Sequence, residues 1–177
     1  QQKNTPKPNP YGTLIHNQHP CAIFTMILQK TTNSIPVLAY TSSLAGNIAG
    51  AECGPTYLQQ SPYFKKKNHI FQWVYQTQAT VPSPAISGAD ALGPVATICT
   101  ELAQYLYTNS SKIPYLVLGG DHSMAIGTWS GLASTCHGDL GLLWIDAHFD
   151  SHTPKSSHSG NIHGMPAAVL LGHGDPD

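Results

Sequence analysis

From residue 35 onward, short apolar runs that suit β-strands alternate with segments that suit helices. The runs at 35–40, 70–75, 113–118 and 140–145 have the length and composition of strands. Between the second and the third run, apolar side chains recur at helical spacing over residues 89–107. Strands that alternate with helices are typical of right-handed βαβ units and a parallel sheet. We therefore predict an α/β domain with four parallel strands, the last two of them buried.

The composition sets the domain boundaries and excludes some classes of protein. Residues 1–21 are rich in Asn, Gln and Pro, which predicts a flexible or draped arm, and residues 22–177 form the α/β unit. The net charge of −1 and the lack of a long apolar run give no basis for binding nucleic acid or a membrane. The four cysteines form no Cys-x-x-Cys pair, which argues against a zinc ribbon. Cys99 and Cys136 fall in expected helices and are interpreted as buried.

Residue types that bind metals alternate directly after the last apolar run. Asp146, His148 and Asp150 are separated by Ala147 and Phe149. In an extended segment such residues point to the same side, and the carboxyl ends of parallel strands are where α/β sheets bind ligands. Two carboxylates and one imidazole suit Mn, Zn or Fe better than Ca or Mg alone. A polar turn would explain the same residues without a function, but we favour the metal site.

A further candidate ligand follows the third apolar run. Gly119 and Gly120 allow a tight turn, after which Asp121 and His122 are displayed at the carboxyl end of the strand. Consecutive parallel strands bring these ends to one edge of the sheet, so we expect His122 to lie near the Asp-x-His-x-Asp residues. A purely structural interpretation stays open, because Asp121 or Ser123 could simply cap the helix that begins there.

The segment 159–164 reads Ser-Gly-Asn-Ile-His-Gly and lies on the loop after the aspartates. Two glycines and small polar residues suit a loop that approaches a substrate closely. The alternative is a solvated turn in which His163 is exposed.

Together these motifs resemble the ureohydrolase family, and within it the arginases most closely. The matching segments are Gly-Gly-Asp-His-Ser at 119–123, Asp-Ala-His-Phe-Asp at 146–150 and Ser-Gly-Asn-Ile-His-Gly at 159–164. The glycine-containing segment 50–55 is similar to an early loop of the family. The resemblance covers residues 35–177, and the order and spacing of the three motifs make it specific.

The resemblance implies a fold, a cofactor and a set of site residues. The fold is a three-layer α/β/α arrangement around an eight-stranded parallel sheet, of which this chain has only part. The cofactor is a pair of Mn²⁺ ions. By motif match, His122 and Asp150 bind one ion, His148 binds the other and Asp146 bridges both. His163 matches the catalytic histidine of the family.

The resemblance also implies a substrate and a reaction. Ser157, Ser159 and Asn161 match positions that hold the α-carboxylate of arginine, and His152 stands where arginases often carry Asn. A hydroxide that bridges the two ions would attack the guanidinium carbon, and His163 would carry a proton to the leaving amine. The implied reaction converts the small-molecule substrate L-arginine to urea and ornithine.

Two other enzyme classes share parts of this pattern. Agmatinases carry the same metal motifs but generally lack Ser-Gly-Asn before the catalytic histidine, so residues 159–161 favour an amino-acid substrate. Metal-dependent deacetylases have a related fold but normally carry a His-His pair, which this sequence does not contain.

The sequence has no counterpart of the later family motif Ser-Phe-Asp-x-Asp-x-x-Asp-Pro, whose first two aspartates complete the metal pair. We therefore expect the chain to be the N-terminal part of a ureohydrolase. A non-catalytic binding or oligomerisation module is the alternative. The family suggests a homo-oligomer in the cytoplasm, and the start at Gln-Gln leaves an exported form open.

Overall fold

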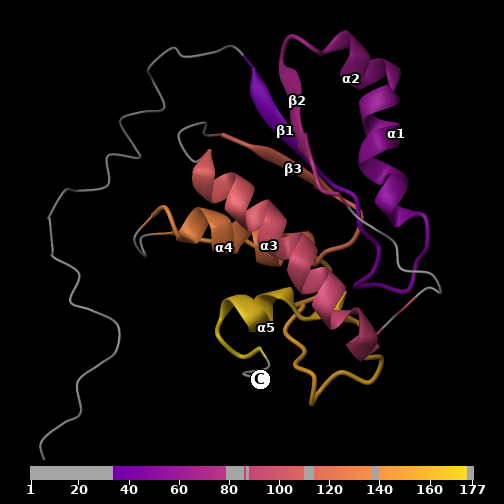
Figure 1. Ribbon diagram of the computed structural model, residues 1–177, viewed down its shortest axis with the longest axis vertical. Helices are drawn as coiled ribbons and strands as arrows, with labels where there is room; N and C mark the ends of the chain where they lie inside the picture. The colour runs from indigo at the N-terminus through magenta and orange to yellow at the C-terminus, as the bar shows by residue number, and fades with distance from the viewer. Residues whose placement is uncertain (1–33, 79–85, 87, 110–113, 137–139, 175–177) are drawn as a thin grey trace, which may run out of the picture.

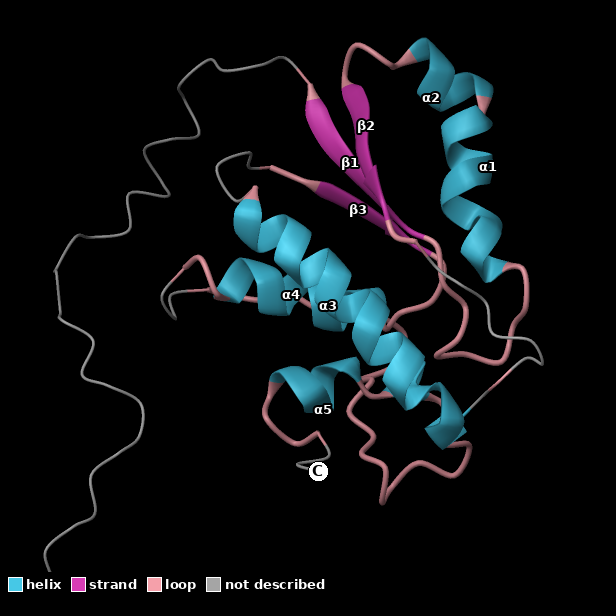
Figure 2. Ribbon diagram, in the orientation of Figure 1, coloured by secondary structure: helices cyan, strands magenta, loops and turns pink. Residues whose placement is uncertain are grey.

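The computed structural model describes residues 34–78, 86, 88–109, 114–136 and 140–174 (Figures 1 and 2). The arm predicted for residues 1–21 and Cys21 lie outside the described residues. Within them, a small parallel sheet is flanked by helices. No helix in this part of the chain is long and apolar enough to cross a membrane.

Three of the four predicted strands form the sheet. Strand β1 (Ile35–Tyr40) lies in the middle, with β2 (Phe71–Gln76) on one side and β3 (Leu116–Gly119) on the other. Both pairings are parallel, as predicted. The last four residues of β1 align one to one with β3 and are buried, because β1 has a strand on each side and helices cover the sheet.

Helices lie on both sides of the sheet, which gives the predicted α/β/α layering. The short helices α1 (Gly54–Gln60) and α2 (Pro62–Lys66) lie on one side, and α3 (Leu92–Thr108) and α4 (Met124–Ala133) lie on the other (Figure 1). Helix α5 (Pro166–Leu170) packs against α4. Pro55 opens α1 at an early helical position, where a missing backbone N–H costs no hydrogen bond.

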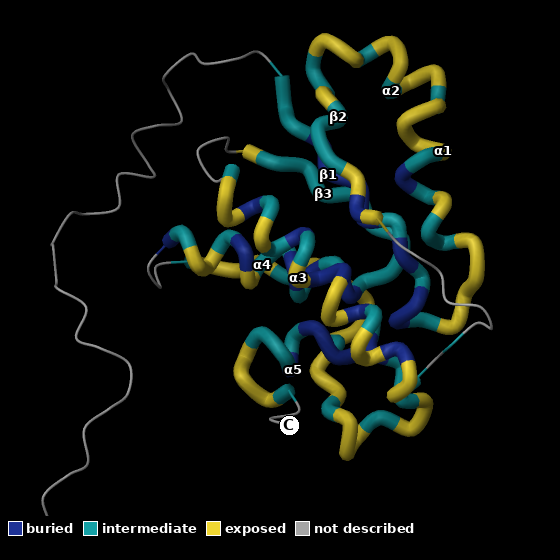
Figure 3. The backbone as a smooth tube through the Cα atoms, viewed as in Figure 1, coloured by how far each residue is buried: buried dark blue, intermediate teal, exposed yellow. Residues whose placement is uncertain are grey.

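The core lies between the sheet and α3 (Figure 3). Leu38 and Tyr40 of β1 are fully buried, as are Leu102 and Leu106 of α3. Val95, about two helical turns before Leu102 on the same face of α3, is also buried. The apolar spacing of this helix in the sequence therefore identifies the face that packs on the sheet.

Two glycines of α4 allow it to approach α3 closely. A Cβ atom on Gly127 would lie 2.5 Å from the carbonyl oxygen of Cys99, and one on Gly131 would lie 2.6 Å from that of Ala103. Any side chain at either position would force the helices apart. Cys99 is buried at this contact, as predicted.

The helix boundaries differ slightly from the predicted ones. The helix predicted over 89–107 begins at Leu92, after a 3-10 turn, η4 (Gly88–Ala91). The helix expected to reach Cys136 ends at Ala133, and Cys136 is buried in the turn that follows, where its N–H donates to the Ala133 carbonyl.

The prediction of a buried strand over residues 140–145 is wrong in this structure. This segment has no strand partner among the described residues, and Leu143 and Ile145 are 81% and 88% exposed. Strand β3 was also predicted to be buried on both faces, but all of its residues are only partly buried. Both differences have one cause: within the described part of the chain, β3 has a neighbour only on its β1 side, and no further strand covers it or pairs with residues 140–145.

Candidate metal centre

The loops that follow β1 and β3 meet at the carboxyl edge of the sheet. The N–H of Gly120 donates to the carbonyl of Tyr40 (2.8 Å), and the N–H of Asp121 donates to that of Ser42 (2.9 Å). Gly120 permits this approach, because a Cβ atom there would overlap the Ser42 carbonyl oxygen. Gly120 is therefore required by the close contact of two backbones, and it fixes the start of the turn from which His122 emerges two residues later.

The carboxylate of Asp121 ties these two loops together. Its Oδ1 accepts hydrogen bonds from the N–H (2.9 Å) and the hydroxyl (2.6 Å) of Ser123, and its Oδ2 accepts from the N–H of Ala45 (3.1 Å). The Ser123 side chain does not cap α4. Asp121 thus forms a turn before the helix and also holds the β1 loop, which places His122 between two anchored neighbours.

A buried polar group lies beneath this turn. The hydroxyls of Tyr40 and Ser123 are 2.7 Å apart, and the thiol of Cys99 donates to the Ser123 carbonyl (3.3 Å). Burial raises the pKa of the Tyr40 hydroxyl and of the Cys99 thiol. Both groups are therefore protonated at neutral pH and act as hydrogen-bonding parts of the core rather than as nucleophiles.

We expect Asp121→Asn to destabilise the chain, because an amide nitrogen cannot accept the hydrogen bonds that two carboxylate oxygens now accept. Leaving one backbone donor unpaired should lower the free energy of unfolding by about 1–3 kcal/mol. Thermal or urea denaturation followed by circular dichroism measures this change. The matched control is Asp90→Asn, at an exposed position in η4. Equal stability of the two variants would show that the Asp121 contacts contribute nothing.

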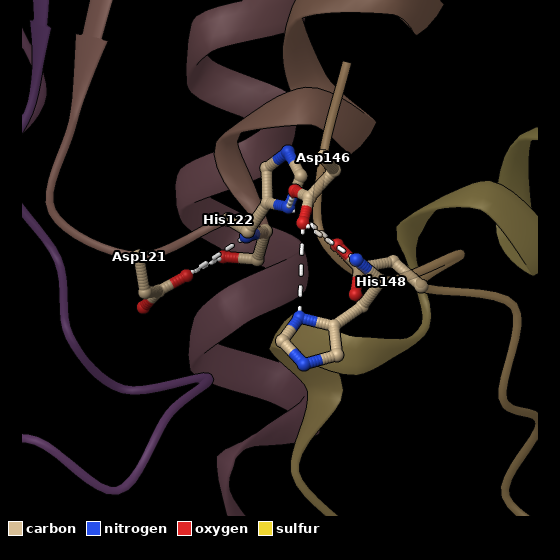
Figure 4. A network of polar contacts seen from close by, with 6 residues as sticks. Asp121, His122, Asp146 and His148 are labelled. Carbon is tan, nitrogen blue, oxygen red and sulfur yellow. Dashed lines mark hydrogen bonds and ion pairs between the residues drawn. The ribbon is translucent and has the colours of Figure 1, made fainter. Parts of the chain in front are cut away.

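The side chains of His122, Asp146 and Asp150 converge next to this turn. Figure 4 shows His122 and Asp146 of this cluster. The Nδ1 of His122 lies 3.3 Å from Oδ2 of Asp146 and 2.5 Å from Oδ2 of Asp150. One potential ligand atom from each residue lies within 4.8 Å of the others. One imidazole nitrogen with two carboxylate oxygens is a donor set that suits Mn, Fe or Zn, so these residues fit a divalent transition metal.

The electrostatics of Asp146 also favour a cation. Its Oδ1 accepts the backbone N–H of His148 at 3.0 Å. This hydrogen bond is the main reason why the pKa of the Asp146 carboxyl lies below its usual value, and the neighbouring His122 lowers it further. The carboxylate is therefore ionised at neutral pH, as a metal ligand must be.

His148 does not join the cluster in the way that the strand pattern predicts. Its side chain is 82% exposed, and its Nδ1 lies 3.7 Å from Oδ1 of Asp146. The alternation fails because the segment is not extended: Asp146 and His148 form a local turn, and Asp150 has a left-handed backbone with φ of 46°. His148 still borders the cluster (Figure 4), and its role as a metal ligand stays a prediction.

All of the predicted site residues line one cleft of about 830 Å³. The predicted metal ligands in it are His122, Asp146, His148 and Asp150. The predicted catalytic and substrate residues in it are His152, Ser157, Ser159, Asn161 and His163. The cleft also contains Asn47, from the loop after β1, which the sequence did not indicate. Four separate segments of the chain therefore meet where three motifs had predicted a site.

His163 is fixed to the same β1 loop that Asp121 holds. It lies in the 3-10 turn η5 (Ile162–Gly164), and its N–H donates to the Ala45 carbonyl (3.0 Å). Its ring lies beside Gly46, where a Cβ atom would be 3.5 Å from Nδ1. The loop after β1 thus aligns the His122 turn and the His163 turn with each other.

The loop before His163 is tightly folded by its own serines. Ser157 Oγ accepts the N–H of Gly160 (3.0 Å), whose φ is 70°, and Ser159 Oγ accepts the N–H of Asn161 (3.3 Å). In each case the hydroxyl proton is still able to donate to a substrate oxygen. The N–H of His152 donates to the Gly164 carbonyl (3.1 Å), which joins the two ends of this loop.

Besides Asn47, sequence reasoning missed the contact of Trp144 and the bridging role of Asp121, both of which shape the centre. The indole of Trp144 packs against the His122 ring, with centroids 4.8 Å apart and planes inclined at 32°. Asp121 was expected either at the carboxyl end of the strand beside His122 or as a helix cap, whereas it bridges two loops. Its place inside the Gly-Gly-Asp-His-Ser motif was a usable signal. The Trp144 contact depends on the path of residues 140–145 and had no signal in the sequence.

Comparison with known proteins agrees with this geometry. The model of the arginase family matches residues 36–176, and the chain belongs to this family. Members of the family are hydrolases. Among curated relatives, the mitochondrial arginase-2 of Rattus norvegicus is 34% identical over 165 residues, which is 89% of this chain and 45% of the relative. The family resemblance expected from the motifs is thereby confirmed.

Solved structures show the same fold. The crystal structure of arginase from Bacillus subtilis is 34% identical in sequence and superposes with a TM-score of 0.64. The alignment covers 81% of this chain and 48% of the Bacillus subtilis chain. The crystal structure of arginase from Entamoeba histolytica in complex with L-ornithine is 27% identical in sequence, with a TM-score of 0.70. The alignment covers 81% of this chain and 50% of the Entamoeba histolytica chain. The chain thus spans about half the length of the relatives that it matches.

Proposed function

We propose that this chain contributes the metal centre and substrate loop of a manganese-dependent arginase, which converts L-arginine to urea and ornithine. The observation that carries the proposal is that every predicted ligand, catalytic and substrate residue lines one cleft. Three ligand atoms already converge there. The relatives are arginases, and one of them was solved with L-ornithine, the product expected of this reaction.

His122, Asp146 and Asp150 would hold Mn²⁺, with His148 beside them as the ligand of a second ion in the complete protein. Bound manganese supplies an acidified water as the nucleophile at neutral pH. The residues of this chain orient the substrate and move a proton. Ser157 and Ser159 hold the amino-acid end by donating their hydroxyl protons to its carboxylate, with Asn161 and His152 alongside.

His163 is suited to the proton transfer. An imidazole can act as a general acid or base, so His163 can give a proton to the amine that leaves the guanidinium carbon and then regain one from solvent. The backbone bond from His163 to Ala45 fixes its position without using either ring nitrogen. Neither ring nitrogen has a hydrogen-bond partner among the described residues, which leaves both available for substrate and water.

The test is urea release by the full-length gene product after loading with Mn²⁺, with L-arginine and agmatine as parallel substrates. We expect urea from arginine and little from agmatine, which lacks the carboxylate that the serines would bind. Urea from agmatine alone would overturn the assignment of residues 159–161. No urea from either substrate would favour a non-catalytic module. A homo-oligomer and a cytoplasmic location stay predictions.

A further inference from the structure

Tyr40, the last residue of β1, contacts the turn that carries His122 at two points. Its backbone carbonyl accepts the N–H of Gly120 at 2.8 Å, two residues before His122. Its side-chain hydroxyl lies 2.7 Å from Oγ of Ser123, the residue directly after His122. One residue of the central strand therefore holds the turn on both sides of the candidate metal ligand.

The direction of the hydrogen bond between Tyr40 and Ser123 follows from a neighbouring carboxylate. The Ser123 hydroxyl has one proton, which it donates to Oδ1 of Asp121 at 2.6 Å. A carboxylate has no proton to give in return, so the Tyr40 hydroxyl must be the donor to Ser123 Oγ. The result is a directed hydrogen-bond network from Tyr40 through Ser123 to Asp121, the residue directly before His122 (Figure 4).

This network starts in the core, whereas the ligand that it supports lies at the cleft. Tyr40 and Ser123 are both 0% exposed. The His122 side chain is 31% exposed, and its Nδ1 faces the carboxylates of Asp146 and Asp150. The direction of this ring depends on how firmly its backbone is held, and Tyr40 connects that backbone to the core on both sides.

We propose that the Tyr40 hydroxyl is a positioning group of the metal centre: by holding Ser123 and Asp121, it fixes the turn so that the imidazole of His122 faces the two aspartates. The proposal rests on the proposed function, because it takes His122 to be a metal ligand. The alternative is a hydroxyl that serves the core alone, in which case its removal would change stability but not metal affinity.

The test is Tyr40→Phe in the full-length gene product, which removes one oxygen atom and keeps the ring. The change leaves Ser123 Oγ without its donor. We expect the dissociation constant for Mn²⁺ to rise about 3- to 10-fold, less than the roughly 10- to 100-fold that follows loss of a group directly behind a ligand, because Tyr40 acts through Ser123. Titration calorimetry well below the melting temperature of the variant measures this change without a contribution from unfolding.

The metal-free protein provides a second readout, which depends on neither manganese nor activity. Histidines that are isotope-labelled at Cε1 each give an NMR signal, and His122→Asn identifies the signal of His122 by its loss. Tyr40→Phe should shift or broaden this signal and leave that of His69, an exposed residue before β2, unchanged. A hydroxyl without a positioning role would affect neither signal.

Two control variants separate positioning from stability and from the chemical change itself. Val95→Ala leaves a cavity in the buried cluster that also contains Tyr40, so it should lower the melting temperature without changing the affinity for Mn²⁺. Tyr105→Phe makes the same chemical change on α3, where the Tyr105 ring stacks on Tyr75 of β2. It should leave the dissociation constant unchanged.

Ser123→Ala tests the route from Tyr40 to the turn. If Tyr40 acts through Ser123, the double variant should bind Mn²⁺ no more weakly than Ser123→Ala alone, because the effects of residues in one hydrogen-bond network are not additive. Additive losses of affinity would contradict this route and overturn the proposal.

Wild-type affinity for Mn²⁺ in Tyr40→Phe would overturn the proposal, as would an equal loss of affinity in Val95→Ala. Neither result affects the proposed function, since the wild-type protein still binds the metal. A wild-type protein that binds no Mn²⁺ and releases no urea would overturn the proposed function and, with it, the role of Tyr40.

Discussion

Replacing Asp146 with asparagine is expected to abolish manganese binding. The carboxylate of Asp146 is central to the cluster, because it contacts His122 and lies between that residue and His148. It is ionised at neutral pH, since hydrogen bonding from His148 lowers its pKa. Asparagine removes the negative charge that attracts the cation. Loss of groups that merely support a ligand weakens metal affinity 10- to 100-fold, so loss of the ligand itself should cost about 100-fold or more.

The measurement is a titration with Mn²⁺ by calorimetry or by metal analysis after gel filtration. The fold should survive, because the amide oxygen of asparagine can still accept the His148 N–H that Asp146 now accepts. Equal melting temperatures of the variant and the wild type would confirm this. The control is Asp90→Asn, an exposed change of the same chemistry. A variant that keeps tightly bound metal would rule out Asp146 as a ligand.

Replacing His163 with alanine is expected to slow urea release from arginine by a factor of about 10²–10⁴, the usual contribution of a general acid or base. Manganese content should not change, because His163 is not one of the converging ligands. Its position is held by the backbone bond to Ala45, which alanine retains. The loss should therefore lie in kcat rather than in folding or metal binding.

This experiment uses the full-length gene product loaded with manganese. His69→Ala serves as the control, since His69 is exposed in the loop before β2 and does not line the cleft. If His163 supplies a proton to the leaving amine, a guanidino substrate whose leaving amine is less basic than that of arginine should be less affected by the loss of His163. An unchanged kcat in the His163 variant would remove it from the mechanism.

Much of the fold could be predicted because its signals are local. The apolar spacing of α3 marks its buried face, and the run Ile35–Tyr40 coincides with β1 residue for residue. The parallel pairing of β1 with both neighbours follows from the helices that separate the strands. The motifs also predicted that distant segments line one cleft, because the carboxyl ends of parallel strands lie at the same edge of a sheet.

The errors arise where structure depends on a partner rather than on local pattern. Residues 140–145 have the composition of a buried strand, but an apolar run becomes a strand only when another strand supplies its hydrogen bonds. The side-chain alternation after it fails for the same reason, because without a strand the chain turns at Asp146 and becomes left-handed at Asp150. The bridging role of Asp121 depends on a contact 76 residues away in sequence, so the Gly-Gly-Asp-His-Ser motif could mark the residue but not its partner.

The most direct test of the account is the manganese content of this chain, measured by metal analysis on protein whose intact mass has been verified. The account predicts one Mn²⁺ per chain at the cluster of His122, Asp146 and Asp150, and a second ion only when the remaining aspartates of the family motif are supplied. A chain of verified mass that binds no more manganese than its Asp146→Asn variant would contradict the claim that these residues form a metal centre.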